Sequence, residues 1–171
     1  MKQFFLGVVV TLAVLLVGGW VFLKLGLAEV RGDVPASPFE SSLMRMAVHA
    51  SVRRNAPEVS SPILPTDENL IAGGKMYLGG CSGCHGTPGK AKKWPDTLNP
   101  PAPRFAEVGT EYSEAQIFWV AKHGIRRTGM FANGAWDDDK KLWTIAAYIK
   151  RIRSLPAEVA EELAKPEKAG D

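Results

Sequence analysis

Two cysteines and a histidine lie together in the segment GGCSGCHG, residues 79–86. Cys81 and Cys84 are the only cysteines of the 171-residue chain, and His85 directly follows the second. Two thiols at this spacing serve as a disulfide, as half of a zinc site, as a redox dithiol or as the attachment point of a larger group. Each alternative requires something different from the rest of the chain.

Three of these alternatives lack support elsewhere in the sequence. A structural zinc site needs four ligands, usually from a second pair nearby, whereas His49 and His123 are unpaired and remote. A thioredoxin-like dithiol lies at a strand-to-helix turn, and no strand pattern precedes Cys81. A disulfide between Cys81 and Cys84 leaves the adjacent His85 unexplained.

Covalent attachment of a haem accounts for all three residues. Two thiols one helical turn apart can form thioethers with the two vinyl groups along one haem edge, and the next residue then projects its imidazole toward the iron. We therefore predict that Cys81 and Cys84 bind one haem c and that His85 is an axial ligand of its iron.

An apolar run without charges occupies residues 4–23 and is long enough, as a helix, to cross a hydrocarbon layer of roughly 30 Å. Lys2 on one side and Trp20 near the far end place the N-terminus in the cytoplasm and the rest outside. Residues 26–28 also suit cleavage of a signal peptide, but the run exceeds a usual signal h-region. We expect a retained single-pass anchor, residues 1–25, in the cytoplasmic membrane.

A linker with one helix is expected between this anchor and the main domain, over residues 26–65. Ser37 is suited to cap a helix over 38–55, with Pro38 at its first position and Glu40 closing a capping box. The proline-rich segment 57–65 ends the linker. The apolar residues of this helix recur at helical spacing: Phe39, Leu43, Met46, Ala47 and Ala50.

The main domain is expected over residues 66–155, followed by a polar tail, 156–171, with one short exposed helix. Five prolines and no periodicity between Gly86 and Gly109 predict a long loop. Capping residues predict three helices, which start at Thr66, at Ser113 and at Asp137 or Asp138 and end at Gly79, at Gly124 and before Pro156. So few helices hold little apolar material, and we expect a large buried cofactor to complete the core.

Residues 66–155 resemble the monohaem class I cytochromes c, in their small, membrane-anchored bacterial form. The resemblance is carried by AGGKMYLGGCSGCHG (72–86), HGIRRTGMFANG (123–134) and LWTIAAYIKRI (142–152). It implies the all-α class I cytochrome c fold, with three or more helices around one covalently bound haem. In that family the first and last helices cross where a small residue packs against an aromatic one, which implies Gly74 and Tyr148 here.

Met130 is the predicted second axial ligand of the iron. It lies in a glycine-flanked, non-helical segment that matches the ligand loop of the family. Met76 is too close to Cys81 in sequence to reach the opposite haem face. His123 is the rival, but the end of a helix is also where a histidine caps carbonyls. Ligation by methionine and histidine raises the reduction potential and suits electron transfer.

The resemblance also implies partners around the two ligands. A proline carbonyl, from Pro100 or Pro101, is expected to accept the other ring N–H of His85 and thereby fix its tautomer. Three further residues are candidate partners of the haem propionates: Trp94, Arg104 and Trp136.

The net charge of +3 is small and the charges are scattered, which argues against nucleic acid as the main partner. Two local basic clusters flank the segments around the predicted haem ligands. We expect them to form a basic rim that attracts an acidic redox protein. The rim consists of Lys90, Lys92, Lys93, Lys122, Arg126 and Arg127.

These observations predict a membrane-tethered, single-haem electron carrier that serves membrane-bound or periplasmic redox proteins and is not an enzyme. Two alternatives stay open. The chain is a haem-bearing subunit of a larger oxidoreductase, with the helix over 38–55 as a docking element, or it is a haem sensor or peroxidase whose sixth iron position is open or labile.

Overall fold

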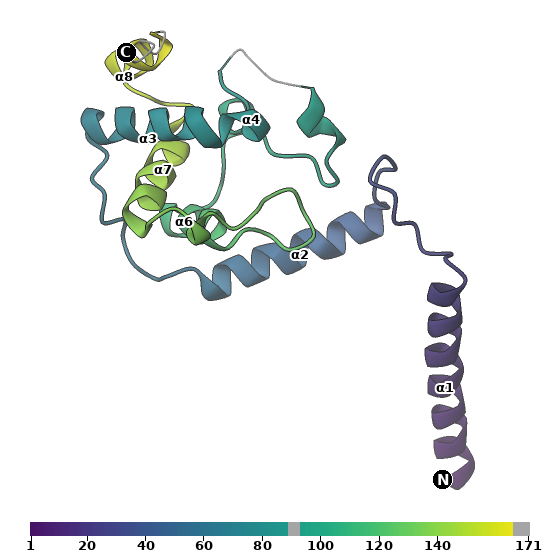
Figure 1. Ribbon diagram of the computed structural model, residues 1–171. Coiled ribbons are helices and arrows are strands. Elements are labelled where there is room, and N and C mark those ends of the chain that lie inside the picture. The colour runs from purple at the N-terminus through teal and green to yellow at the C-terminus, as the bar shows by residue number, and fades with distance from the viewer. Residues whose placement is uncertain (89–92, 166–171) are drawn as a thin grey trace. The chain divides into compact units, whose positions relative to one another are not determined.

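The computed structural model describes residues 1–88 and 93–165 (Figure 1). All regular elements within these residues are helical, so the fold is all-α, as predicted. The chain divides into two compact units, Met1–Gly32 and Asp33–Asp171.

The first unit is dominated by one apolar helix, α1, which spans Lys2–Lys24. None of its residues is buried, and its length and composition are sufficient for crossing a membrane. The one hydroxyl in its middle, that of Thr11, donates to the Gly7 carbonyl at 2.9 Å, so this polar group is satisfied within the helix. α1 is therefore a candidate membrane anchor, although a signal sequence has the same properties.

The second unit begins with α2, Pro38–Asn55, which has the predicted cap: the Ser37 hydroxyl accepts from the Glu40 N–H at 3.1 Å. This helix packs against α6, Glu114–His123, and buries Val52 there. The apolar residues at helical spacing include side chains on the solvent side of the helix, since Phe39 is 77% and Met46 61% exposed.

The core is built on the crossing of α3, Asp67–Gly80, and α7, Asp139–Arg151 (Figure 1). Both helices begin at the predicted caps, where Thr66 accepts from the Asn69 N–H and Asp138 from the Lys141 N–H. α7 is buried over its whole middle, from Leu142 to Ile149. A helix buried on every side must pack against neighbours that approach closely.

Glycines of α3 permit this approach. A methyl group at Gly73 would overlap the backbone carbonyl of Thr144 and come within 2.9 Å of the Tyr148 Cβ. At Gly74 it would meet the Leu163 side chain, with Cδ2 at 2.8 Å, and the ring edge of Tyr148 at 3.0 Å. The predicted contact of Gly74 with Tyr148 is thus present, but the closest approach of the two backbones is at Gly73.

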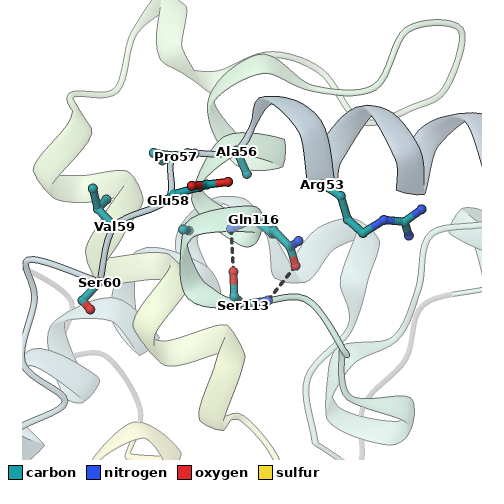
Figure 2. A pocket seen from close by; sticks show the side chains of 9 residues that line it. Arg53, Ala56, Pro57, Glu58, Val59, Ser60, Ser113 and Gln116 are labelled. Atoms are coloured by element: carbon teal, nitrogen blue, oxygen red, sulfur yellow. Dashed lines mark hydrogen bonds between the residues drawn. The ribbon is translucent and has the colours of Figure 1, made fainter.

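The helix α6 fixes the other side of α7. Ser113 and Gln116 form the predicted capping box, with bonds of 3.2 and 3.0 Å (Figure 2), and Gly124 ends the helix at φ 66°. Phe118 stacks on Trp143 of α7, with ring centroids 4.3 Å apart and planes 7° from parallel. This stack attaches α6 to the core around α7.

The segment between Gly86 and Gly109, predicted as a long loop, contains two short helices within its described part: the 3₁₀ helix η1 (Trp94–Thr97) and α5 (Phe105–Val108). The short helix α4 (Ser82–His85) directly precedes this segment, and a further 3₁₀ helix, η2 (Asn133–Ala135), precedes α7.

The C-terminal helix α8, Ala157–Ala164, is not simply exposed as predicted. Val159 is completely buried, and Leu163 packs on Gly74 of α3. The short apolar pair in an otherwise polar segment is enough to dock one side of this helix on the core.

We predict that Gly73→Ala destabilises the protein by about 1–3 kcal/mol, because the new methyl meets backbone of α7 that cannot move aside without separating the helices. Gly74→Ala is the matched control: its methyl meets the flexible end of Leu163, so the loss is smaller. Chemical denaturation of both variants measures the difference. Equal losses would contradict the assignment of the crossing to Gly73.

Candidate functional site

The cysteine motif forms a tight helical turn at the end of α3. Cys81 caps α3, its N–H bonding to the Tyr77 carbonyl at 2.8 Å, and also begins α4. The His85 N–H returns to the Cys81 carbonyl at 3.0 Å. Cys81 and Cys84 therefore lie one turn apart, and the imidazole follows on the same turn.

The two thiols are half-buried and are not joined in a disulfide. Burial, with smaller contributions from Asp137 and Cys84, raises the pKa of the Cys81 thiol to about 11. A thiol with this pKa is neutral at pH 7, unlike the activated thiolate of a redox dithiol. Within residues 1–88 and 93–165, no three side chains of His, Cys, Asp or Glu gather as a metal site, so zinc finds no ligand set there.

His85 is held in one orientation and one tautomer. Its Nδ1 lies 2.8 Å from the Pro103 carbonyl oxygen, and its ring stacks on Phe105 with centroids 4.6 Å apart. A carbonyl can only accept, so Nδ1 carries the proton and Nε2 keeps its lone pair. Burial lowers the pKa of His85, which favours this neutral form. The imidazole is thus prepared to ligate a metal through Nε2.

The predicted acceptors Pro100 and Pro101 were wrong, and Pro103 takes their place. The reason is local: α5 starts at Phe105, and the stack of Phe105 on His85 brings the carbonyl two residues earlier to the imidazole. The segment 100–103 contains three prolines. The only sequence feature that distinguishes Pro103 from the other two is the aromatic Phe105, two residues after it.

Tyr77 connects α3 to the chain that leaves the motif. Its hydroxyl donates to the Gly86 carbonyl at 2.7 Å, and the side chain is completely buried. Burial raises the pKa of Tyr77, so the hydroxyl stays neutral and keeps its proton for this bond. Gly86 lies at φ 71°, a conformation that favours glycine. Sequence analysis did not single out Tyr77, because a tyrosine at a core position gives no sign of its bonding partner.

Met130 lies in a closed loop after α6. Its carbonyl accepts from the Ile125 N–H at 2.9 Å and its N–H donates to the Thr128 hydroxyl at 3.0 Å, while that hydroxyl donates to the Ile125 carbonyl at 2.8 Å. The backbone of this loop passes close to Gly124, where a methyl group would lie only 2.6 Å from the Met130 carbonyl oxygen, so the loop requires glycine at this position. Thr128 is a second residue that sequence analysis missed.

The segments that carry His85 and Met130 both adjoin η1. α4 contacts η1 directly. Leu98, which follows η1, packs against Gly129: a methyl group at position 129 would lie only 3.0 Å from the Leu98 Cδ1. The histidine turn and the methionine loop are therefore joined through one short helix, although 45 residues separate the two side chains in sequence.

Apolar side chains on these segments are left uncovered. Leu78 on the last turn of α3, Trp94 in η1, and Phe131 and Trp136 beside the Met130 loop are all exposed to solvent. The glycines at 79, 80 and 83 have open space where a side chain would lie. Two thiols, one neutral imidazole and an uncovered apolar surface fit a large, flat, apolar group such as a haem.

Arg104 and His123, two other candidate residues of the sequence, make contacts elsewhere in the domain. Arg104 pairs with Asp96 at 2.7 Å and with Glu107 at 3.6 Å. His123 is exposed at the end of α6, where its ring lies 5.1 Å from that of Trp119. No contact described for these two residues joins them to the cysteine turn or to the Met130 loop.

The predicted basic rim is only partly available. Lys93, Arg126 and Arg127 are exposed. Lys122 forms an ion pair with Asp139 at 2.6 Å and lies over the Phe118 ring, so its charge is engaged within the domain. Lys90 and Lys92 lie outside the described residues.

A separate pocket of about 520 Å³ lies between the end of α2 and the start of α6 (Figure 2). Its walls come from residues 53, 56–60, 113, 115 and 116, none of which belongs to the cysteine turn or to the Met130 loop. It is open to solvent and is a different feature from the candidate haem site.

Comparison with known proteins yields one match. Residues 68–149 match the family model described as "Cytochrome C oxidase, cbb3-type, subunit III". The match covers most of α3, the cysteine turn, the Met130 loop and most of α7. No curated protein and no solved structure matches the chain.

We predict that Tyr77→Phe lowers the free energy of unfolding by about 1–3 kcal/mol, because the buried Gly86 carbonyl loses its donor. Tyr148→Phe is the matched control: the described structure gives the Tyr148 hydroxyl no hydrogen bond, so its removal costs less. Denaturation of the holoprotein measures both. A Tyr77→Phe protein as stable as the wild type would refute this role of the hydroxyl.

Proposed function

Because the chain belongs to the class I monohaem c-type cytochromes, we propose that it is a membrane-tethered electron carrier with one haem c. In this proposal Cys81 and Cys84 form the thioethers, and His85 and Met130 are the axial ligands of the iron. The observation that carries it is the bond from His85 Nδ1 to the Pro103 carbonyl. It leaves Nε2 free as a ligand on the same turn as both thiols.

The residues of the site have separate tasks. Haem c, when bound, supplies a one-electron iron(II)/iron(III) couple. The thioethers of Cys81 and Cys84 keep the group on the turn, and Pro103 and Phe105 hold the His85 ring at a fixed orientation. The hydrogen-bonded loop after α6 holds the backbone of Met130, whose thioether is the proposed ligand. Fixed ligands suit electron transfer, since they need little rearrangement when the iron changes its charge.

The proposed tether is α1, retained as a single-pass anchor with its N-terminus in the cytoplasm and the haem domain outside. Its uniformly exposed apolar side chains support this. The proposed organisation is an anchor over 1–25, a linker over 26–65, the haem domain over 66–155 and a tail over 156–171. A tether keeps the domain at high effective concentration near membrane-bound redox proteins.

A second candidate function is a haem-bearing subunit of a larger oxidoreductase. It is favoured by the description of the matching family, which names an oxidase subunit. Elution of the protein with a heteromeric complex after mild solubilisation of membranes supports the subunit, whereas elution alone supports the free carrier.

The proposed ligand Met130 is tested by substitution. We expect Met130→Ala to lower the reduction potential by on the order of 0.1 V, within the roughly 0.8 V that axial ligands span. Met76→Leu is the control, because Met76 packs against the hydrophobic core; its potential stays close to that of the wild type. Potentiometric titration of both holoproteins measures the shift. An unchanged potential in Met130→Ala excludes Met130 as the ligand.

The proposed docking surface is tested by salt. Exposed Lys93, Arg126 and Arg127 are expected to attract an acidic partner, so the rate of electron transfer to such a protein falls as ionic strength rises. Neutralising all three to Gln flattens this dependence, whereas Lys75→Gln on the exposed side of α3 leaves it unchanged. Stopped-flow measurement decides: a rate that is flat with salt in the wild type rules out the basic surface.

A further inference from the structure

The outward side of α2 carries a row of uncovered apolar side chains. Phe39, Leu43 and Met46 are 77%, 45% and 61% exposed, and Ala50 continues the row. These residues follow at intervals of four, three and four, which places them on one face of a helix. A row of this kind is unusual on a surface that faces only water.

This face is not the one that holds α2 on the domain. Successive residues of a helix advance by about 100°, so Val48 and Val52 lie on the side opposite the row. Val52 is 1% exposed, and His49, beside it, bonds to the Tyr112 hydroxyl at 3.0 Å. The haem domain therefore binds one side of α2 and leaves the apolar side unpartnered.

Positive charge accompanies the row. α2 contains Arg45, Arg53 and Arg54 against the single acid Glu40. The helical advance places Arg53 and Arg54 on either side of the row, and no ion pair engages the arginines of α2 among the described residues. Arg53 is exposed, lines the edge of the pocket between α2 and α6, and extends away from Glu58, the acid just after the helix (Figure 2).

If α1 is the proposed membrane tether, the length of the linker limits how far α2 can lie from the lipid surface. Only residues 25–37 separate the end of α1 from the start of α2, and thirteen residues span at most about 45 Å. Within them Leu25, Leu27 and Val30 are also exposed. An exposed apolar row with basic residues on either side can lie in a membrane interface, with the long cationic side chains reaching the headgroups.

We propose that the outward face of α2 docks on an anionic bilayer surface, with Phe39, Leu43 and Met46 in the acyl boundary and Arg53 and Arg54 at lipid phosphates. The proposal rests on the membrane tether of the proposed function. It gives the linker helix a task beyond spacing: it restricts the tumbling of the haem domain above the membrane.

A spin label at Leu43 tests this in the full-length holoprotein. In the proposed holoprotein Cys81 and Cys84 are bonded to haem, so Leu43→Cys provides one reactive thiol; Ser51→Cys, exposed on α2 away from the row, is the matched control. The proteins are reconstituted in vesicles of phosphatidylcholine with phosphatidylglycerol. Power saturation of the electron paramagnetic resonance signal then measures how often the spin label collides with oxygen, which enters lipid, and with a nickel chelate, which stays in water.

We expect the label at 43 to collide more with oxygen than with nickel, and the label at 51 to show the reverse. Replacing Arg53 and Arg54 by Gln lowers the oxygen preference at 43 to the value found in vesicles of phosphatidylcholine alone. A label at 43 that prefers nickel in the anionic vesicles overturns the proposal. The proposal is also overturned if the shielding of the label at 43 from nickel disappears as the protein is diluted in lipid. In that case a second copy of the protein, and not the lipid, covers the face.

Carbonate extraction of the same vesicles separates this proposal from the tether. Protein that resists extraction while the label at 43 stays in water retains the anchor and rejects the docking of α2. Release of the protein by carbonate would contradict the membrane tether, and with it the docking of α2, which rests on the tether. Shielding of the label that arises only when a solubilised redox complex is added rejects the lipid surface in favour of a protein partner.

Discussion

The close approach of α3 to α7 at Gly73 is the constraint on which the rest of the structure depends. A backbone carbonyl of α7 occupies the space where a side chain at position 73 would lie. This contact fixes the position of α3 on α7, and the cysteine turn begins where α3 ends. The same helix also receives Leu163 of α8 at Gly74. Two adjacent glycines thus allow α3 to be packed on two sides while its last turn stays free to carry the site.

The site itself is prepared by hydrogen bonds more than by buried volume. Pro103 fixes the tautomer of His85, Tyr77 holds the turn after the motif, and Thr128 closes the loop around Met130. Pro103 and Thr128 bond directly to the two proposed ligands, His85 and Met130, without being proposed to touch the haem themselves. Exposed apolar side chains lie on the same segments, namely Leu78, Trp94, Phe131 and Trp136. We infer that the cofactor and the fold complete each other.

Local signals made the helices predictable. Ser37, Thr66, Ser113 and Asp138 all cap helices as expected, because a capping side chain acts within three residues of itself. Contacts between distant segments could not be predicted in the same way. The choice of Pro103 over its neighbours depends on the stack of Phe105, and the burial of Val159 accompanies the packing of α8 on α3. The exposed row of α2 shows the converse, since amphipathic spacing indicates a face but not what covers it.

The central claim is a covalently bound haem with His85 and Met130 as its axial ligands. The absorption spectrum of the purified ferric protein tests it most directly, because a bond between the methionine sulfur and iron gives a charge-transfer band of its own. With both ligands bound, we expect a low-spin spectrum that contains this band. A high-spin spectrum without the band would contradict ligation by Met130 and leave an iron site suited to binding ligands rather than to carrying electrons.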